Sequence, residues 1–209
     1  MTDPTRTTYE GLTLAYDFFN ARLFGGRLPR CLITMQRKKK ACGYFSGGRF
    51  GTVDGSEITD EIALNPTHFR DRTTEQSLST LVHEMAHLQQ HHFGTASRNG
   101  YHNKEWGDMM RAVGLIPSSS GAVGGKQTGQ RMSLYIDAGG PFDIACAALI
   151  ADGFVVKYVD LFGDRDSAKK KAESKTKYTC PNRGLNAWSK PDIHLACQDC
   201  EQLMLPDGK

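Results

Sequence analysis

The sequence predicts an α+β protein in which a helix with a metal-binding motif packs on a small sheet, followed by a cysteine-containing tail. Three observations predict this class. Apolar residues recur at spacings of three and four over residues 9–24 and 78–88, which is typical of amphipathic helices. Short apolar runs have the length of strands. Cysteines gather near the C-terminal end, at Cys180, Cys197 and Cys200.

The first half of the chain alternates a helix with short strands. The helix over residues 9–24 is expected to pack on the core, and a strand over residues 31–35 follows it. A glycine-rich, aromatic segment over residues 42–50 predicts a strand and turn. A further strand over residues 61–64 ends at Pro66.

The next helix carries the motif H-E-x-x-H at His83, Glu84 and His87. Residues four apart lie on one face of a helix, so the two imidazoles can occupy neighbouring positions on a tetrahedral zinc ion. Glu84 can reach the open coordination position and act as a base toward a zinc-bound water. Thr73 or Thr74 can cap the helix. An ordinary amphipathic helix is the alternative, but the surrounding sequence favours the metal.

The histidines further along the same helix are poorly placed to provide a third ligand. His91 and His92 extend it, but His91 lies about 12 Å along the helix axis from His83, which is too far for zinc–nitrogen bonds of about 2.0–2.1 Å. The metzincin extension, H-E-x-x-H-x-x-G-x-x-H, is not followed, because Gln90 and Phe93 stand at its glycine and histidine positions.

The third ligand is therefore expected from the next loop. A glycine-containing loop followed by a helix over residues 104–113 would return His102 to the first two histidines. His102 is the favoured ligand and Glu105 is the alternative. Tyr101 beside it is a candidate for stabilising an oxyanion, with simple loop packing as the other interpretation.

The motifs and their order resemble the SprT-like family of Spartan-related zinc metalloproteases. The resemblance covers about residues 8–115, and it is carried by residues 43–45, 62–66, 81–87 and 100–106. It implies a compact α+β fold, a minimal zincin. It also implies zinc held by His83, His87 and His102, with Glu84 as the catalytic acid and base.

The implied function is that of a zinc-dependent endopeptidase that acts on DNA-associated or DNA-crosslinked proteins. A DNA-binding module with weak or lost proteolysis is an alternative function. A metallopeptidase with no role on DNA is another.

The composition changes after residue 116, where serine and glycine become frequent. The small extension is expected to contain a helix over residues 143–151 and a strand over residues 154–159, followed by a basic segment over residues 164–177 that is either a helix or an exposed connector. The expected parts are an SprT-like metalloprotease domain over 8–116, a linker or mobile loop over 117–133, a small αβ extension over 134–177 and a ribbon-like module over 178–204.

The tail resembles the zinc ribbon that follows many SprT-like domains. A complete ribbon closes around zinc with two C-x-x-C pairs. Cys197 and Cys200 form the second pair, but Arg183 replaces the cysteine expected three residues after Cys180. Three thiolates, completed by His194, could hold a second, structural zinc. A ribbon without metal is the alternative.

Charges are segregated along the chain although the net charge is only +3. Residues 27–49 contain basic side chains and no acidic ones, acidic residues dominate 54–84, and a second basic stretch covers 165–183. This asymmetry predicts a surface that meets a polyanion, with a solvated charged face as the alternative. The candidate DNA-binding residues are Arg37, Lys38, Lys39 and Lys40.

Nothing in the sequence indicates a membrane protein. The first eight residues contain no apolar run of the kind found in signal peptides, and no segment approaches the roughly 20 apolar residues of a membrane span. We therefore expect a cytoplasmic or DNA-associated protein with no membrane partner, whose cysteines stay reduced or bind metal.

Overall fold

The computed structural model describes residues 3–98, 100–162 and 175–206, and the chain forms two compact units, Met1–Leu161 and Phe162–Lys209. The first unit contains α1 (Pro4–Leu23), β1 (Leu32–Met35), β2 (Gly43–Gly51), β3 (Ile58–Leu64), a short 3-10 helix (Pro66–His68), α2 (Thr74–Phe93), α3 (Lys104–Ala112), β4 (Leu115–Ser118), β5 (Ser133–Ile136) and α4 (Pro141–Ala151). The second contains β6 (Thr176–Thr179), β7 (Asn186–Ser189) and β8 (Leu205–Pro206). This mixture of helices and small sheets confirms the predicted α+β class.

The main sheet has the order β1-β3-β2. The central strand β3 pairs in parallel with β1 and antiparallel with β2, so β2 forms an edge of the sheet. A register shift between Ser46 and Phe50 bends β2. Strands β4 and β5 form a separate antiparallel pair.

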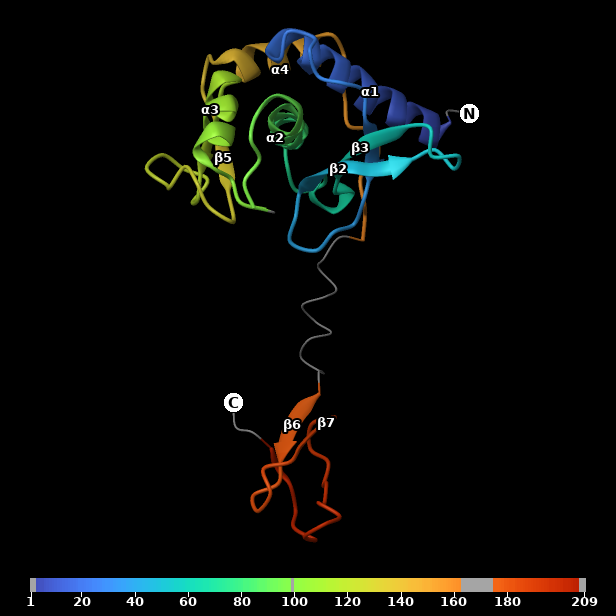
Figure 1. Ribbon diagram of the computed structural model, residues 1–209, viewed down its shortest axis with the longest axis vertical. Coiled ribbons are helices and arrows are strands. Elements are labelled where there is room, and N and C mark those ends of the chain that lie inside the picture. Colours follow the sequence, from blue (N-terminus) through green and yellow to red (C-terminus); the bar gives the residue numbers. More distant parts are fainter. Residues whose placement is uncertain (1–2, 99, 163–174, 207–209) are drawn as a thin grey trace. The chain divides into compact units, whose positions relative to one another are not determined.

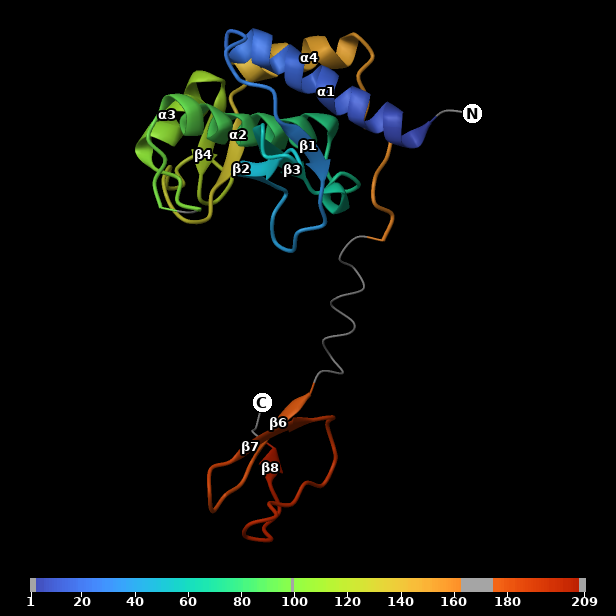
Figure 2. The same cartoon turned by 45° about the vertical axis from the view of Figure 1, so that its right-hand side comes forward.

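Helix α2 lies at the centre of the first unit, with α1 and α4 on one side and the main sheet on another (Figures 1 and 2). Thr73 accepts the backbone N–H of Gln76 while the Gln76 side chain accepts the N–H of Thr73, a reciprocal cap that fixes where the helix begins. Its fully buried apolar residues are Leu81, Val82, Met85, Ala86 and Leu88. Burying a large aliphatic side chain stabilises the fold by about 1.5–3 kcal/mol.

Helix α1 begins five residues before the predicted start, because Asp3 caps it and Pro4 occupies its first turn. Its apolar face buries Ala15, Tyr16 and Phe19. The Tyr16 hydroxyl donates to the Pro29 carbonyl at 2.5 Å, which joins the helix to the chain leading into β1.

The segment expected to be a separate αβ extension packs into the same core, as far as the structure describes it. Phe142 of α4 is fully buried and stacks on Phe19 of α1 with ring centroids 5.6 Å apart. The predicted strand over residues 154–159 is wrong: no neighbouring strand pairs with it in the described residues, although Phe154 packs on the core. Residues 163–174 of the predicted basic segment lie outside the described residues.

The segment expected as a linker, residues 117–133, overlaps two strands that the sequence patterns do not predict. Its ends belong to β4 and β5, which pair from Leu115–Ile136 to Ser118–Ser133. Within the described part of the chain, no helix combines the length and apolar character that a membrane crossing requires.

Substituting Phe142 tests whether α4 belongs to the cooperative core. Phe142→Ala should lower the free energy of unfolding of the first unit by about 3–5 kcal/mol, because it leaves a cavity against Phe19. Ile144→Ala on the same helix is the matched control, since Ile144 is 64% exposed and should change stability by less than about 0.5 kcal/mol. Equal effects of the two substitutions in urea denaturation would contradict the assignment.

Candidate metal and active site

Three histidines converge at one position of the first unit. His83 and His87 lie one turn apart on α2, with ring centroids 5.1 Å apart. His102, from the loop before α3, brings its ring centroid to 5.4 Å from that of His83 and 4.9 Å from that of His87. One ligand nitrogen of each ring lies within 4.8 Å of the other two. The structure therefore gathers the three histidines that the sequence singled out.

His102 is held in place by Gly129, from the segment between β4 and β5. The two residues form an isolated antiparallel bridge, and His102 Nδ1 lies 3.1 Å from the Gly129 carbonyl oxygen. A carbonyl only accepts hydrogen bonds, so Nδ1 carries the proton and Nε2 keeps its lone pair. This hydrogen bond leaves Nε2 as the nitrogen able to bind metal.

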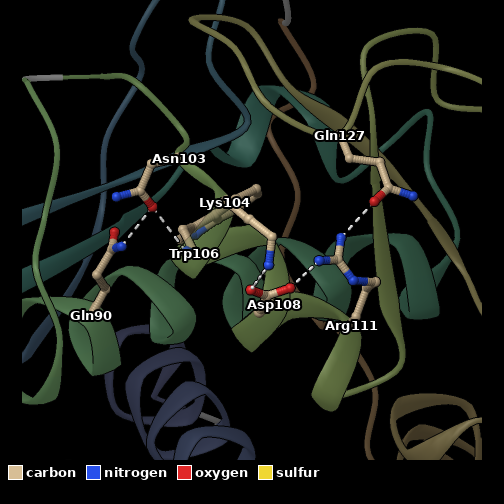
Figure 3. Close-up of polar contacts among 7 residues, drawn as sticks. All are labelled: Gln90, Asn103, Lys104, Trp106, Asp108, Arg111 and Gln127. Carbon is tan, nitrogen blue, oxygen red and sulfur yellow. Dashed lines mark hydrogen bonds and ion pairs between the residues drawn. The ribbon is translucent and has the colours of Figure 1, made fainter.

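Polar contacts fix the start of α3 against α2 (Figure 3). Asn103 Oδ1 accepts the backbone N–H of Trp106 at 2.9 Å and the side-chain amide of Gln90 at 2.8 Å. Further along α3, Arg111 donates to Gln127 at 2.6 Å (Figure 3). These contacts flank His102 and the segment that carries Gly129, so they set how far the loop stands from α2.

Trp106 packs against all three histidine rings. It is fully buried, stacks on His87 with centroids 5.1 Å apart, and lies 4.9 Å from His83 and 4.3 Å from His102. Its indole Nε1 is a buried donor with no partner among the described residues. A buried indole ring in contact with all three imidazoles restricts them to few rotamers.

Glu105, the alternative third ligand, is used elsewhere. Its Oε2 accepts the backbone N–H of Thr95 at 2.8 Å and the Gln90 amide at 2.7 Å. Gln90, which stands at the metzincin glycine position, thus links α2 to both the loop and α3. His91 and His92 also lie apart from the three histidines, next to Asp60.

Glu84 is buried beside the histidines, with 4% of its surface exposed. A Cβ on Gly43 of β2 would lie 3.0 Å from Glu84 Oε1 and 2.9 Å from Thr80, so only glycine lets β2 approach α2 this closely. Burial raises the pKa of Glu84 to about 8, although the positive charge of Lys38 acts in the opposite direction.

Burial also keeps the three imidazoles neutral. It lowers the pKa of His87 to about 3, with repulsion from His102 adding to the effect. Burial lowers the pKa of His83 as well, and repulsion from His87, His102 and Arg72 adds to the effect. Burial lowers the pKa of His102, although its hydrogen bond to Gly129 acts in the opposite direction. Neutral imidazole is the form that binds metal.

A cavity of about 1340 Å³ opens over these residues and reaches β2, α2 and the loops that carry His102 and Gln130. Tyr101 lines it, under the guanidinium of Arg98 at 5.0 Å from the ring centroid. The basic side chains that line it are Lys38, Lys40, Arg49, Arg72, Arg98 and Arg131.

The four candidate DNA-binding residues lie in different surroundings. Lys38 and Lys40 line the cavity, and the Lys38 ammonium lies 4.1 Å from the centroid of the Tyr44 ring. Lys39 is exposed. Arg37 forms an ion pair with the buried Asp160 at 2.5 Å, so it has a structural role.

The second unit gathers the thiols of Cys180, Cys197 and Cys200, whose sulfur atoms lie within 4.8 Å of one another. Although burial acts to raise it, the pKa of Cys180 is lowered by the backbone N–H groups of Arg183 and Asn182 and by the neighbouring thiols. Arg183 itself pairs with Asp199 at 3.3 Å. His194 is exposed and does not join the three thiols.

Comparison with known proteins agrees with this geometry. The sequence model of the SprT-like family matches residues 12–122, more than half of the chain. The chain belongs to the SprT-like family. A Salmonella typhimurium protein described as an uncharacterized protein in the mucB 3' region is 51% identical over 59 residues, which cover 28% of this chain and 80% of that protein.

Membership in the SprT-like family makes residues 12–122 a zinc metallopeptidase-like domain, with zinc as the implied metal.

Several residues that build the site could not be recognised from sequence patterns. Gly129 lies in the expected linker, where nothing identifies it as a partner of His102. Trp106 belongs to the segment that carries the family resemblance, but its contact with all three rings depends on the path of the loop. The Gln90–Asn103 contact joins two elements and has no local signal.

The histidine pKa values predict how the metal-free protein responds to acid. Between about pH 6.5 and pH 3 the unfolded chain protonates His87 and the folded one does not, so this residue lowers stability as the pH falls. In urea denaturation of metal-free protein, the stability difference between wild type and His87→Gln should shift against the wild type by about 1.4 kcal/mol for each pH unit below 6.5. A difference that does not depend on pH would contradict the buried, neutral imidazole.

Proposed function

We propose that the protein is a zinc-dependent endopeptidase that acts on DNA-associated or DNA-crosslinked proteins. The observation that carries the proposal is the convergence of His83, His87 and His102 beside the buried carboxyl group of Glu84, at the floor of an open cavity. Three neutral imidazoles form a donor set that suits zinc and leaves one coordination position for substrate or water. When bound, the metal supplies a Lewis acid that polarises a carbonyl group.

Glu84 is the proposed general base. Its side chain lines the cavity, and burial is the main cause of the raised pKa of its carboxyl group. A raised pKa makes the carboxylate form of Glu84 a stronger base than an ordinary carboxylate, and a nearby positive charge such as that of Lys38 favours this form. In this role it takes a proton from the attacking water and later gives it to the leaving amine.

Strand β2 is the proposed platform for the substrate. It is an edge strand, and its residues Gly43, Tyr44 and Phe45 line the cavity opposite α2. An extended peptide can pair with the free backbone groups of such an edge, which would align its scissile bond along the cavity. Tyr101 on the facing loop is the candidate for stabilising a developing oxyanion.

The Glu84→Gln substitution tests the general base. It should lower the rate of peptide cleavage by at least about 10²–10⁴-fold, because the amide cannot take a proton, while the zinc content stays unchanged. The assay compares purified wild type and variant on a histone and on casein, with metal content measured in the same samples. Retained cleavage in a variant preparation free of contaminating protease would contradict the role of Glu84.

DNA association is supported by the charge of the cavity rim. Six basic side chains line the cavity, and Glu84 is its only acidic lining residue in the described part of the chain. The Lys38 ammonium lies over the Tyr44 ring, so a positive charge and an aromatic group stand together where a nucleotide could contact both. A metallopeptidase with no role on DNA would cleave casein and a histone equally well with and without DNA, whereas the proposed enzyme needs DNA to reach full activity.

Charge reversal tests the DNA interaction. Replacing Lys38, Lys39 and Lys40 by Glu should weaken DNA binding and flatten the dependence of log K on log salt by about 0.7–0.9 for each phosphate group that the protein no longer binds. Fluorescence anisotropy over a range of salt concentrations measures both quantities. Arg37 is kept, because its ion pair with Asp160 belongs to the fold.

The matched control reverses three exposed lysines outside the cavity lining, Lys126, Lys157 and Lys190, which changes the net charge equally. It should alter the salt dependence much less. If both triple variants behave alike, the binding depends on overall charge and not on the cavity rim. Salt-insensitive binding, or none, would remove DNA from the proposed function.

The three thiols of the second unit are proposed to hold a second, structural zinc. The backbone N–H groups that stabilise the Cys180 thiolate suit a metal ligand, and the Sγ atoms of Cys180 and Cys200 lie 3.5 Å apart. With Arg183 at the position of a fourth cysteine, the remaining ligand would be water or another side chain.

A further inference from the structure

A second histidine-containing cluster lies at the C-terminal end of α2. His91 and His92 face Asp60 of β3, and one ligand atom from each of these side chains lies within 4.8 Å of the other two. The two imidazole side chains are 45% and 35% exposed, whereas that of Asp60 is only 9% exposed. His91 follows His87 by one helical turn, about 6 Å along the axis, but the two clusters share no residue among the described metal-binding groups.

The distances in the cluster are close to those of a metal site. His92 Nε2 lies 2.6 Å from Asp60 Oδ2, and His91 Nε2 lies 3.9 Å from Asp60 Oδ1. Ligand atoms on a tetrahedral zinc ion are about 3.4 Å apart when the zinc–ligand bonds are about 2.0–2.1 Å. The two distances, which end on the two oxygens of one carboxylate, lie about 0.8 Å below and about 0.5 Å above this value, so side-chain rotations of that size would bring each nitrogen to a ligand spacing from Asp60.

The surroundings restrict the ligands to this arrangement. A Cβ on Gly47 would lie 2.6 Å from the His91 ring, so the β2 backbone packs directly on the imidazole. Phe45 lies against the same ring, with centroids 5.4 Å apart. The backbone N–H of Gly48 donates to Asp60 Oδ1 at 2.7 Å and orients the carboxylate. A hydrogen-bonded carboxylate and packed imidazoles are typical of a preorganised ligand set.

The position of His91 and His92 at the C-terminal end of α2 also favours a bound cation. Both histidines belong to the last turn of α2, which ends at Phe93. The unpaired carbonyl groups of a helix C-terminus carry a partial negative charge that favours a cation nearby. A single protonated His92 paired with Asp60 would use this field too, but it leaves His91 without a hydrogen bond among the described residues.

We propose that Asp60, His91 and His92 form a peripheral binding site for a divalent transition metal of the zinc class, open to solvent on one side. Two imidazoles and one carboxylate suit zinc or cobalt, whereas magnesium and calcium prefer sets of oxygen ligands. The bound metal links β3 and the adjoining turn of β2 to the end of α2. It therefore stabilises the rim of the cavity, independently of whether the protein cleaves peptides.

Metal analysis of the full chain tests this site. After dialysis against buffered zinc, wild type should hold one zinc equivalent more than the double variant His91→Gln, His92→Gln, whatever the occupancy of the other sites. His68→Gln is the matched control, because His68 lies on the same unit outside every cluster of metal-binding side chains that the structure describes, and it should keep the wild-type zinc content. Magnesium or calcium should not replace the lost equivalent.

Two further measurements make the test independent of any one variant. Added zinc should raise the thermal midpoint of wild type more than that of the double variant, and cobalt in the additional site should absorb in the visible range without thiolate charge-transfer bands. If the double variant folds poorly, Asp60→Asn replaces it, since the amide oxygen can still accept the Gly48 N–H. Equal zinc content in wild type and the folded variant would overturn the proposal and leave an ordinary His92–Asp60 ion pair.

Discussion

The burial of ionisable groups on one central helix is the constraint on which the structure depends. Helix α2 is surrounded by apolar packing, yet it carries Glu84, His83 and His87 on the side that faces the cavity. Burying charged groups is costly, so the carboxyl group is driven toward its protonated form and the imidazoles toward their neutral form. The apolar core stabilises the helix, and the same burial keeps the ligands neutral and makes the carboxylate form of Glu84 a stronger base. Metal binding would relieve part of this cost.

The second requirement is the return of the chain to α2. His102 reaches the helix histidines because Asn103 caps α3, Gln90 ties that cap to α2, and Gly129 binds the His102 ring and backbone. Trp106 then packs against the three rings. A metal site with two ligands from one helix turn and a third from a loop thus relies on contacts between three segments that are distant in sequence.

Much of this arrangement could be predicted from local patterns. The α+β class, the position of α2 and the spacing of His83 and His87 follow from periodicity and motif, because a helix fixes the geometry of residues four apart. The β4–β5 pair could not be predicted, because serine and glycine in residues 117–133 resemble a linker while the pairing is set by distant partners. The strand predicted over residues 154–159 does not form for a similar reason. A strand needs a neighbouring strand to pair with, and apolar composition does not show whether one is present. Gly129, Trp106 and the Asp60 cluster have no local signal, since their roles arise from contacts made by the folded chain.

The central claim is that His83, His87 and His102 hold one zinc ion next to Glu84. Crystallography of zinc-loaded protein, with anomalous diffraction collected on both sides of the zinc absorption edge, tests it most directly. We expect an anomalous peak about 2.0–2.1 Å from one ring nitrogen of each histidine. A zinc-loaded crystal in which no peak lies between these three rings, or in which His102 stays away from the ion, would contradict the claim.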